Sequence, residues 1–218
     1  MHGSIHNLIE IQKQIKLTSQ KQNSSITKII AVSKTFDLQN IIPLIEYGHL
    51  DFGENKVQEA LDKWTSIKSA NTKIKLHMIG KLQSNKVKFA VKIFDYIHSL
   101  DNKKLADKIA DEQTKQNKKI KLFIQINIGN EEQKSGVKKN DIVDFYHYCI
   151  SLNLNVIGTM CIPPMAKESQ NFFLEMNKIN EQLNLSDLSM GMSEDYLEAV
   201  KHESTFVRIG SKIFGKRG

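Results

Sequence analysis

The sequence predicts an α/β fold, a single (β/α)8 barrel of the TIM type that spans residues 1–218 as one domain and starts with a helix. Eight short apolar runs have the composition of strands, and each of them but the last precedes a segment with helical periodicity. Such strict alternation requires parallel strands joined by right-handed crossovers. Eight of these units use up the chain, so we expect one barrel and no second domain.

An open, doubly wound sheet is the alternative fold with the same alternation. Nucleotide-binding sheets of that kind carry a GxGxxG or GxxxxGK[ST] run after their first strand. No such run follows the first apolar strand here, and the chain shows no repeats or low-complexity linkers. The barrel is therefore the preferred prediction.

The individual elements follow from the spacing of apolar residues. The expected strands cover residues 29–32, 50–53, 74–79, 95–100, 120–128, 156–162, 188–192 and 206–209. The expected helices cover residues 5–20, 38–47, 56–68, 85–93, 102–116, 142–150, 172–183 and 194–202. Gly48 should end the second helix, while Asp101 and Ser193 should cap the helices that follow them.

The composition, with 40% hydrophobic and 25% charged residues, is that of an ordinary globular protein. No apolar run approaches the roughly 18 residues that a membrane span needs. The N-terminus lacks the apolar core of a signal peptide. Cys149 and Cys161 are too few for a disulfide framework, so we expect a reducing cytoplasm.

The net charge of +7 and the isoelectric point near 9.2 raise the question of nucleic-acid binding. The lysines are scattered singly or in pairs, however, and no aromatic residues are interleaved with them. That distribution is typical of solvated helix faces and loop ends. We expect no nucleic-acid function.

Lys34 is the most informative single residue. It follows the apolar run 29–32, at the end of a strand that should be buried on both faces. An ammonium group in such a place tends toward its neutral form, and a neutral lysine can attack an aldehyde to form a Schiff base. The alternative is a lysine whose stem is buried and whose head reaches water.

The other strand ends converge on the same mouth of a barrel. Phosphate groups are commonly bound there by the loops after strands seven and eight. Gly191 and Ser193 follow the seventh predicted strand, and Arg208, Gly210 and Ser211 end the eighth. A reactive lysine, a phosphate cradle and an arginine on one rim are typical of a pyridoxal 5′-phosphate site.

Seven motifs in register give the sequence a resemblance to a known family. They are AVSK (31–34), FGENK (52–56), HMIGKLQSNK (77–86), EQKSG (132–136), GTMCIP (158–163), LSMGMS (188–193) and VRIG (207–210). Together they closely resemble the pyridoxal phosphate homeostasis protein family, over about residues 29–215. That family is a single-domain relative of the alanine racemase barrel, and it is thought to buffer and deliver the cofactor.

The resemblance implies a role for seven residues of this chain. Lys34 would carry the cofactor as a Schiff base; Ser193, Gly210 and Ser211 would hold the phosphate; Arg208 would face the pyridine nitrogen; Asn55 and Met160 would line the ring pocket. The chain departs from the family at Phe36, where a proline is usual, and after Gly210, where threonine and a small residue are usual. Ser211 keeps the hydroxyl and the amide, so we expect the phosphate site to persist and Lys212 to point outward.

The resemblance also favours a cofactor carrier over an enzyme. Arginine only donates hydrogen bonds, so Arg208 would hold the ring nitrogen unprotonated and weaken the electron sink. Racemases of the related fold use a second domain that supplies a tyrosine, whereas Lys34 is the one base evident here. We expect a monomeric, non-catalytic carrier with pyridoxal-phosphate-dependent apo-enzymes as recipients. The alternative is a pyridoxal-phosphate-dependent amino-acid racemase or lyase.

Four further residues have competing interpretations. His77 could polarise a group in the site, but a hydrogen-bonded structural histidine is the better prediction. Cys161 is expected to pack rather than to react. Lys134 could take part in cofactor transfer or form a surface salt bridge, and Asn55 could cap a helix as well as contact the ring. The histidines lack metal-ligand spacing, so we expect no metal.

Overall fold

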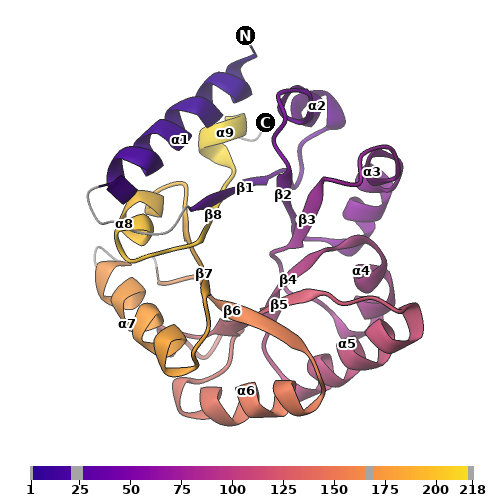
Figure 1. The fold of residues 1–218 in the computed structure, drawn as a ribbon, viewed down its shortest axis with the longest axis vertical. Coiled ribbons are helices and arrows are strands. Elements are labelled where there is room, and N and C mark those ends of the chain that lie inside the picture. The colour runs from indigo at the N-terminus through magenta and orange to yellow at the C-terminus, as the bar shows by residue number, and fades with distance from the viewer. Residues whose placement is uncertain (1, 21–26, 165–168, 216–218) are drawn as a thin grey trace.

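The computed structural model describes residues 2–20, 27–164 and 169–215, and its strands form a closed parallel barrel. The strands follow one another around the barrel in chain order, and β1 closes it by pairing with β8 (Figure 1). The strands are β1 Lys28–Val32, β2 Asp51–Glu54, β3 Lys75–Met78, β4 Tyr96–Leu100, β5 Lys121–Ile126, β6 Asn155–Cys161, β7 Asp187–Met192 and β8 Phe206–Ile209. The predicted (β/α)8 fold is confirmed.

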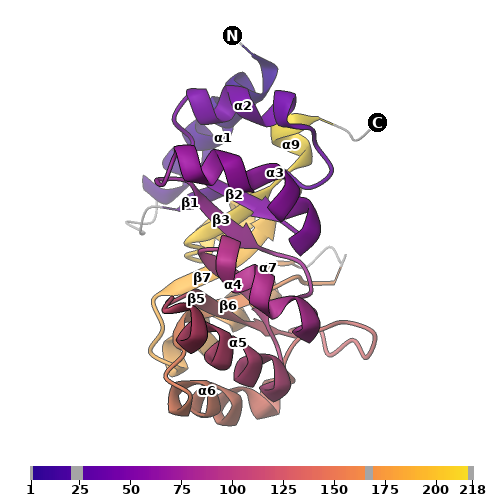
Figure 2. The same cartoon turned by 90° about the vertical axis from the view of Figure 1, so that its right-hand side faces the viewer.

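Helices surround this barrel as an outer ring (Figure 1). They are α1 Gly3–Gln20, α2 Leu38–Glu46, α3 Val57–Ala70, α4 Val87–Ile93, α5 Lys103–Gln116, α6 Ile142–Ser151, α7 Ser169–Gln182, α8 Tyr196–Lys201 and α9 Ser211–Phe214, with 3₁₀ turns η1 Ser84–Lys86 and η2 Lys139–Asp141. The sequence did not predict α9, which packs on α1 at one end of the molecule (Figure 2). Asn7 of α1 secures this contact, because its amide donates to the carbonyl of Ile213 at 3.0 Å.

The two predicted N-caps were wrong, each for a local reason. Asn102 rather than Asp101 precedes α5, and its side chain accepts from the N–H of Leu105 at 2.9 Å. Helix α8 begins at Tyr196, two residues later than expected, so Ser193 lies too far from it to act as a cap. The predicted stop at Gly48 is confirmed, since this glycine has a φ of +96° directly after the C-cap of α2.

Two separate cores hold the barrel together. A large outer core lies between the strands and the helices, while a small inner core fills the barrel with Ile30, Tyr96, Phe123, Met160 and Phe206. Polar side chains share this interior, as the site below shows. Among the described residues, no helix has the length and apolar character needed to cross a membrane.

Candidate functional site

Lys34 lies in the turn directly after β1, and its side chain is partly buried. The turn is held against β2 by its backbone: the N–H of Ser33 donates to the carbonyl of Gly53 at 3.0 Å, and the N–H of Phe36 closes the turn on the carbonyl of Ser33 at 3.2 Å. Thr35 has a φ of +66°, which is unusual for a residue with a side chain. The lysine therefore projects from a tightly shaped backbone segment.

The buried carboxylate of Glu54 fixes this turn from the end of β2. Glu54, at the end of β2, is fully buried, and its Oε1 accepts from Ser33 Oγ at 2.8 Å, Lys63 Nζ at 3.0 Å and Trp64 Nε1 at 3.0 Å. Burial raises the pKa of Glu54, and the hydrogen bond from Trp64 and the charge of Lys63 work against that rise. Lys63 also donates to the carbonyl of Ser33 at 2.9 Å. The residue before Lys34 is thus tied to two side chains of the β2–α3 unit.

A second carboxylate fixes the other side of the turn. Glu59 Oε1 accepts from the N–H of Thr35 at 2.6 Å and from Lys63 Nζ at 3.0 Å. Burial acts to raise the pKa of Glu59, but these two hydrogen bonds and the charges of Lys63 and Lys56 outweigh it, so the pKa is lowered. We call Ser33, Glu54, Glu59 and Lys63 the lysine clamp.

The lysine clamp was not predicted from the sequence as a unit. Glu59 and Lys63 stand at the i,i+4 spacing of a helical ion pair, which was the available signal. Nothing in the spacing indicated that this pair would turn toward the strand-end residue Glu54.

The predicted phosphate-binding residues Ser193 and Ser211 are brought together on a second flank, where β7 and β8 end. Ser211 Oγ donates to Ser193 Oγ at 3.0 Å, linking the loop after β7 to the start of α9. Ser193 is buried while Ser211 is exposed. Lys212 is exposed as expected, with its Nζ 5.2 Å from the centroid of the Tyr196 ring. Two hydroxyls from different loops therefore lie within hydrogen-bond distance of each other.

A glycine sets the path of the chain into this flank. Gly191 has a φ of +88°, and a Cβ built on it would lie 2.5 Å from the Cβ of Ala199 and 3.0 Å from the Cα of Tyr196. The end of β7 can approach α8 this closely only without a side chain. This contact directs the following residues toward Ser193.

The two flanks are neighbours because β1 pairs with β8. Ile30 is in register with Arg208, and Ala31 with Ile209. A Cβ built on Gly210 would lie 3.4 Å from the Cβ of Val32, two residues before Lys34. The lysine turn and the predicted phosphate loop thus leave the barrel side by side.

Arg208 lies in the barrel between these flanks and is 4% exposed. Its Nη1 donates to the carbonyl and the Oγ of Ser189, both at 2.7 Å, and its Nη2 donates to the carbonyl of Cys161 at 2.8 Å. Burial lowers the pKa of this guanidinium from its ordinary value, although arginine stays charged in proteins. Among the described residues these bonds use three of its five N–H groups, leaving donors for a further acceptor.

The predicted ring contacts Asn55 and Met160 lie in different parts of the barrel. Asn55 follows β2 and its Oδ1 is buried, with no hydrogen-bond partner among the described residues. Its predicted capping role was wrong, because Lys56 is the N-cap of α3. Met160 is fully buried in the inner core, in register with Ser189. A role for either in ring binding stays a prediction.

The remaining candidates have structural partners. His77 is fully buried and hydrogen-bonded, as predicted. Cys161 is buried and burial raises the pKa of its thiol to about 12, which agrees with packing rather than nucleophilic chemistry. Lys134 forms an ion pair, with its Nζ 2.5 Å from Glu131 Oε2.

Comparison with known proteins identifies the family. The family model described as "Alanine racemase, N-terminal domain" matches residues 6–218. The pyridoxal phosphate homeostasis protein of Pasteurella multocida is 37% identical, over 97% of this chain and 96% of its own length. PipY of Synechococcus elongatus, solved without PLP, is 30% identical with a TM-score of 0.84, over 98% of this chain and all of its own.

PipY has also been solved with PLP bound, and that structure covers 93% of this chain and 99% of its own at a TM-score of 0.77 and 30% identity. These relatives match the chain over nearly its whole length. The chain therefore belongs to the pyridoxal phosphate homeostasis protein family, whose barrel is that of the alanine racemase N-terminal domain.

Proposed function

We propose that this protein binds pyridoxal 5′-phosphate (PLP) covalently, as a Schiff base on Lys34, and serves cytoplasmic PLP homeostasis by holding the cofactor and passing it to apo-enzymes. The observation that carries the proposal is the convergence of Lys34, Arg208 and the Ser193–Ser211 pair at one mouth of the barrel. The relatives named for PLP homeostasis, and the PLP-bound structure of PipY, support the same cofactor.

The polar groups of this mouth fit the cofactor. PLP supplies an aldehyde that condenses with an amine, a ring nitrogen that accepts a hydrogen bond and a phosphate dianion. Lys34 offers the amine, Arg208 the ring donor, and Ser193, Gly210 and Ser211 the hydroxyl and amide donors for the phosphate. The buried Oδ1 of Asn55 lacks a partner among the described residues, which favours a bound donor there because an unpaired buried oxygen costs about 1–3 kcal/mol.

The lysine clamp and Arg208 each have a role in holding the cofactor. The lysine clamp fixes the backbone on both sides of Lys34, and so fixes the point from which its side chain starts. Arg208 has no hydrogen-bond acceptor, so as a donor it would hold the ring nitrogen unprotonated. This arrangement favours storage of the cofactor over carbanion chemistry, and we propose a non-catalytic carrier.

Reductive labelling tests the proposal directly. PLP is added to the protein, borohydride reduces any Schiff base, and peptide mass spectrometry locates the pyridoxyl group. We expect the label on Lys34, its loss in Lys34→Ala and its retention in Lys81→Ala, a control in which an exposed lysine is removed. A label elsewhere, or none, would overturn the covalent assignment.

Two functional assays test the carrier role. Loaded protein is mixed with an apo-aminotransferase in the presence of a phosphatase that destroys free PLP. Recovery of aminotransferase activity indicates direct transfer, and its absence contradicts delivery. The Lys134→Ala variant tests whether Lys134 takes part in the transfer.

Incubation of loaded protein with L- and D-alanine should give no racemised or cleaved product, and sustained turnover would instead establish an enzyme.

A further inference from the structure

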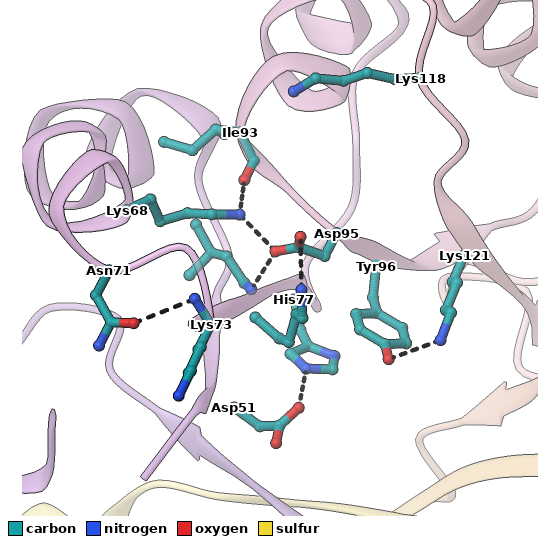
Figure 3. A network of polar contacts seen from close by, with 12 residues as sticks. Asp51, Lys68, Asn71, Lys73, His77, Ile93, Asp95, Tyr96, Lys118 and Lys121 are labelled. Carbon is teal, nitrogen blue, oxygen red and sulfur yellow. Dashed lines mark hydrogen bonds and ion pairs between the residues drawn. The ribbon is translucent and has the colours of Figure 1, made fainter. Parts of the chain in front are cut away.

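A chain of hydrogen bonds crosses the barrel interior from Arg208 to the opposite mouth. Arg208 Nη1 donates to Ser189 Oγ at 2.7 Å, and Ser189 Oγ lies 2.8 Å from His98 Nδ1. His98 Nε2 lies 3.0 Å from His77 Nδ1, and His77 Nε2 lies 3.0 Å from Asp51 Oδ1. Figure 3 shows the last of these contacts, with His77 pointing at Asp51.

The two ends of this chain determine the direction of every bond in it. The carboxylate of Asp51 only accepts, so His77 donates from Nε2. Burial lowers the pKa of His77, and burial together with the charge of Arg208 lowers that of His98 well below its ordinary value, so both rings are neutral at neutral pH.

A neutral His77 then accepts at Nδ1 from His98 Nε2–H. His98 in turn accepts at Nδ1 from the hydroxyl of Ser189, whose Oγ is left to accept from Arg208. Each group thus donates toward Asp51. Both histidines carry their proton on Nε2.

Aromatic rings enclose this series of hydrogen bonds. His77 stacks on Tyr96 with ring centroids 4.2 Å apart, and His98 stacks on Phe123 at the same distance. His77, His98 and Ser189 are fully buried, whereas the side chain of Asp51 is 23% exposed at the first residue of β2. A polar chain in such surroundings depends on its members for partners, and breaking one link leaves its neighbours unsatisfied.

We propose that Asp51, His77, His98 and Ser189 form a positioning relay that fixes the guanidinium of Arg208, so that cofactor binding at one mouth of the barrel depends on a carboxylate at the other. The inference rests on the proposed function, in which Arg208 faces the ring nitrogen of PLP. Ser189 is the relay member that hydrogen-bonds to Arg208, and the other three act through it. The relay orients the donor and takes no part in bond making.

Nuclear magnetic resonance of the intact protein with ¹⁵N-labelled histidine tests the relay without any substitution. We expect both His77 and His98 as neutral Nε2–H tautomers. Addition of PLP should shift the ring resonances of His98 and, by less, those of His77. The ring of His49, which lies near Asp51 but bonds to its carbonyl at 2.9 Å, is the internal control and should not move. An Nδ1–H tautomer of either relay ring, or unmoved relay resonances in protein that binds PLP, would overturn the relay.

A matched pair of variants tests the dependence on Asp51. Asp51→Asn removes the terminal charge, while Asp95→Asn removes a comparable carboxylate at the same mouth, one that is paired with Lys68 at 2.5 Å and lies outside the relay (Figure 3). Pyridoxine 5′-phosphate, which lacks the aldehyde, reports ring and phosphate binding alone. We expect Asp51→Asn to weaken its binding by about tenfold, the size of coupling within one hydrogen-bond network, and Asp95→Asn by less than about twofold.

Urea unfolding of both variants separates binding from stability. Equal effects of the two substitutions on pyridoxine 5′-phosphate binding would overturn the relay. Failure of the unmodified protein to bind PLP would instead overturn the proposed function, and the histidine tautomers would still test the hydrogen-bond chain.

Discussion

The two flanks of the site are built by different means. On the lysine flank, side chains fix the structure: three hydrogen bonds from Glu54, Glu59 and Lys63 tie the turn to the β2–α3 unit. Two more join Lys63 to the two carboxylates within that unit. On the phosphate flank, backbone shape does the work: Gly191 sets the path of the chain, and one bond joins Ser193 to Ser211.

The difference agrees with what each flank is proposed to bind. The proposed Schiff base needs an amine whose side chain starts from a fixed backbone, and the buried, charged lysine clamp fixes that backbone. A phosphate is bound by several donors around a loop, so the path of the backbone matters more than any one side chain. We therefore expect substitutions on the lysine flank to be costly, and those on the phosphate flank to be costly only where the backbone is constrained.

The largest effect should come from Lys63→Met. This substitution leaves Glu54 buried and without its cation, and breaking a buried ion pair in this way costs about 3–5 kcal/mol in the free energy of unfolding. Lys139→Met is the control, since its partner Glu175 is 39% exposed and such pairs contribute about 0–1 kcal/mol. Urea denaturation measures both. Similar losses in the two variants would contradict the importance of the lysine clamp.

On the other flank, Gly191→Ala should destabilise the protein by about 2–4 kcal/mol, because it adds backbone strain to a clash with Ala199. Gly48→Ala separates these causes. Gly48 has a φ of +96° but no atom within 4 Å of an added Cβ, so strain of about 1 kcal/mol remains. In thermal and urea unfolding, the two variants should differ in stability by the cost of the clash. Equal losses of stability would show that the close approach of Gly191 to α8 contributes nothing.

How far the sequence predicted these flanks depends on the range of the interaction. The strands and the Gly191 and Gly210 loops follow from local patterns, and these were found. The lysine clamp was missed because Glu54 and Lys63 lie on different elements, and only their packing shows that both reach Ser33. His98 was missed as part of a network for the same reason, since its partners come from β3 and β7.

The two buried histidines of the relay should make the free energy of unfolding depend on pH. The pKa values of His77 and His98 are lowered by burial, so both rings stay neutral in the folded protein while they take up protons in the unfolded chain below the ordinary value of 6.5. Stability is therefore fully present above pH 6.5 and falls as the pH drops toward the folded-state values. The expected slope approaches about 1.4 kcal/mol per pH unit for each histidine. Urea midpoints that stay constant from pH 7 to 5.5 would contradict neutral, buried rings.

The smallest effect on the fold, and the sharpest test of the phosphate flank, is Ser211→Ala. Ser211 is exposed and its hydroxyl donates to Ser193, so its removal should change the free energy of unfolding by less than about 0.5 kcal/mol. If the hydroxyl binds phosphate, affinity for pyridoxine 5′-phosphate should fall about fivefold, because one hydrogen bond contributes about 1 kcal/mol. The control ligand is pyridoxine, which lacks the phosphate and should bind both proteins equally. Equal weakening of both ligands would mean that Ser211 shapes the mouth of the barrel without contacting the phosphate, and the flank would then depend on backbone donors and Ser193.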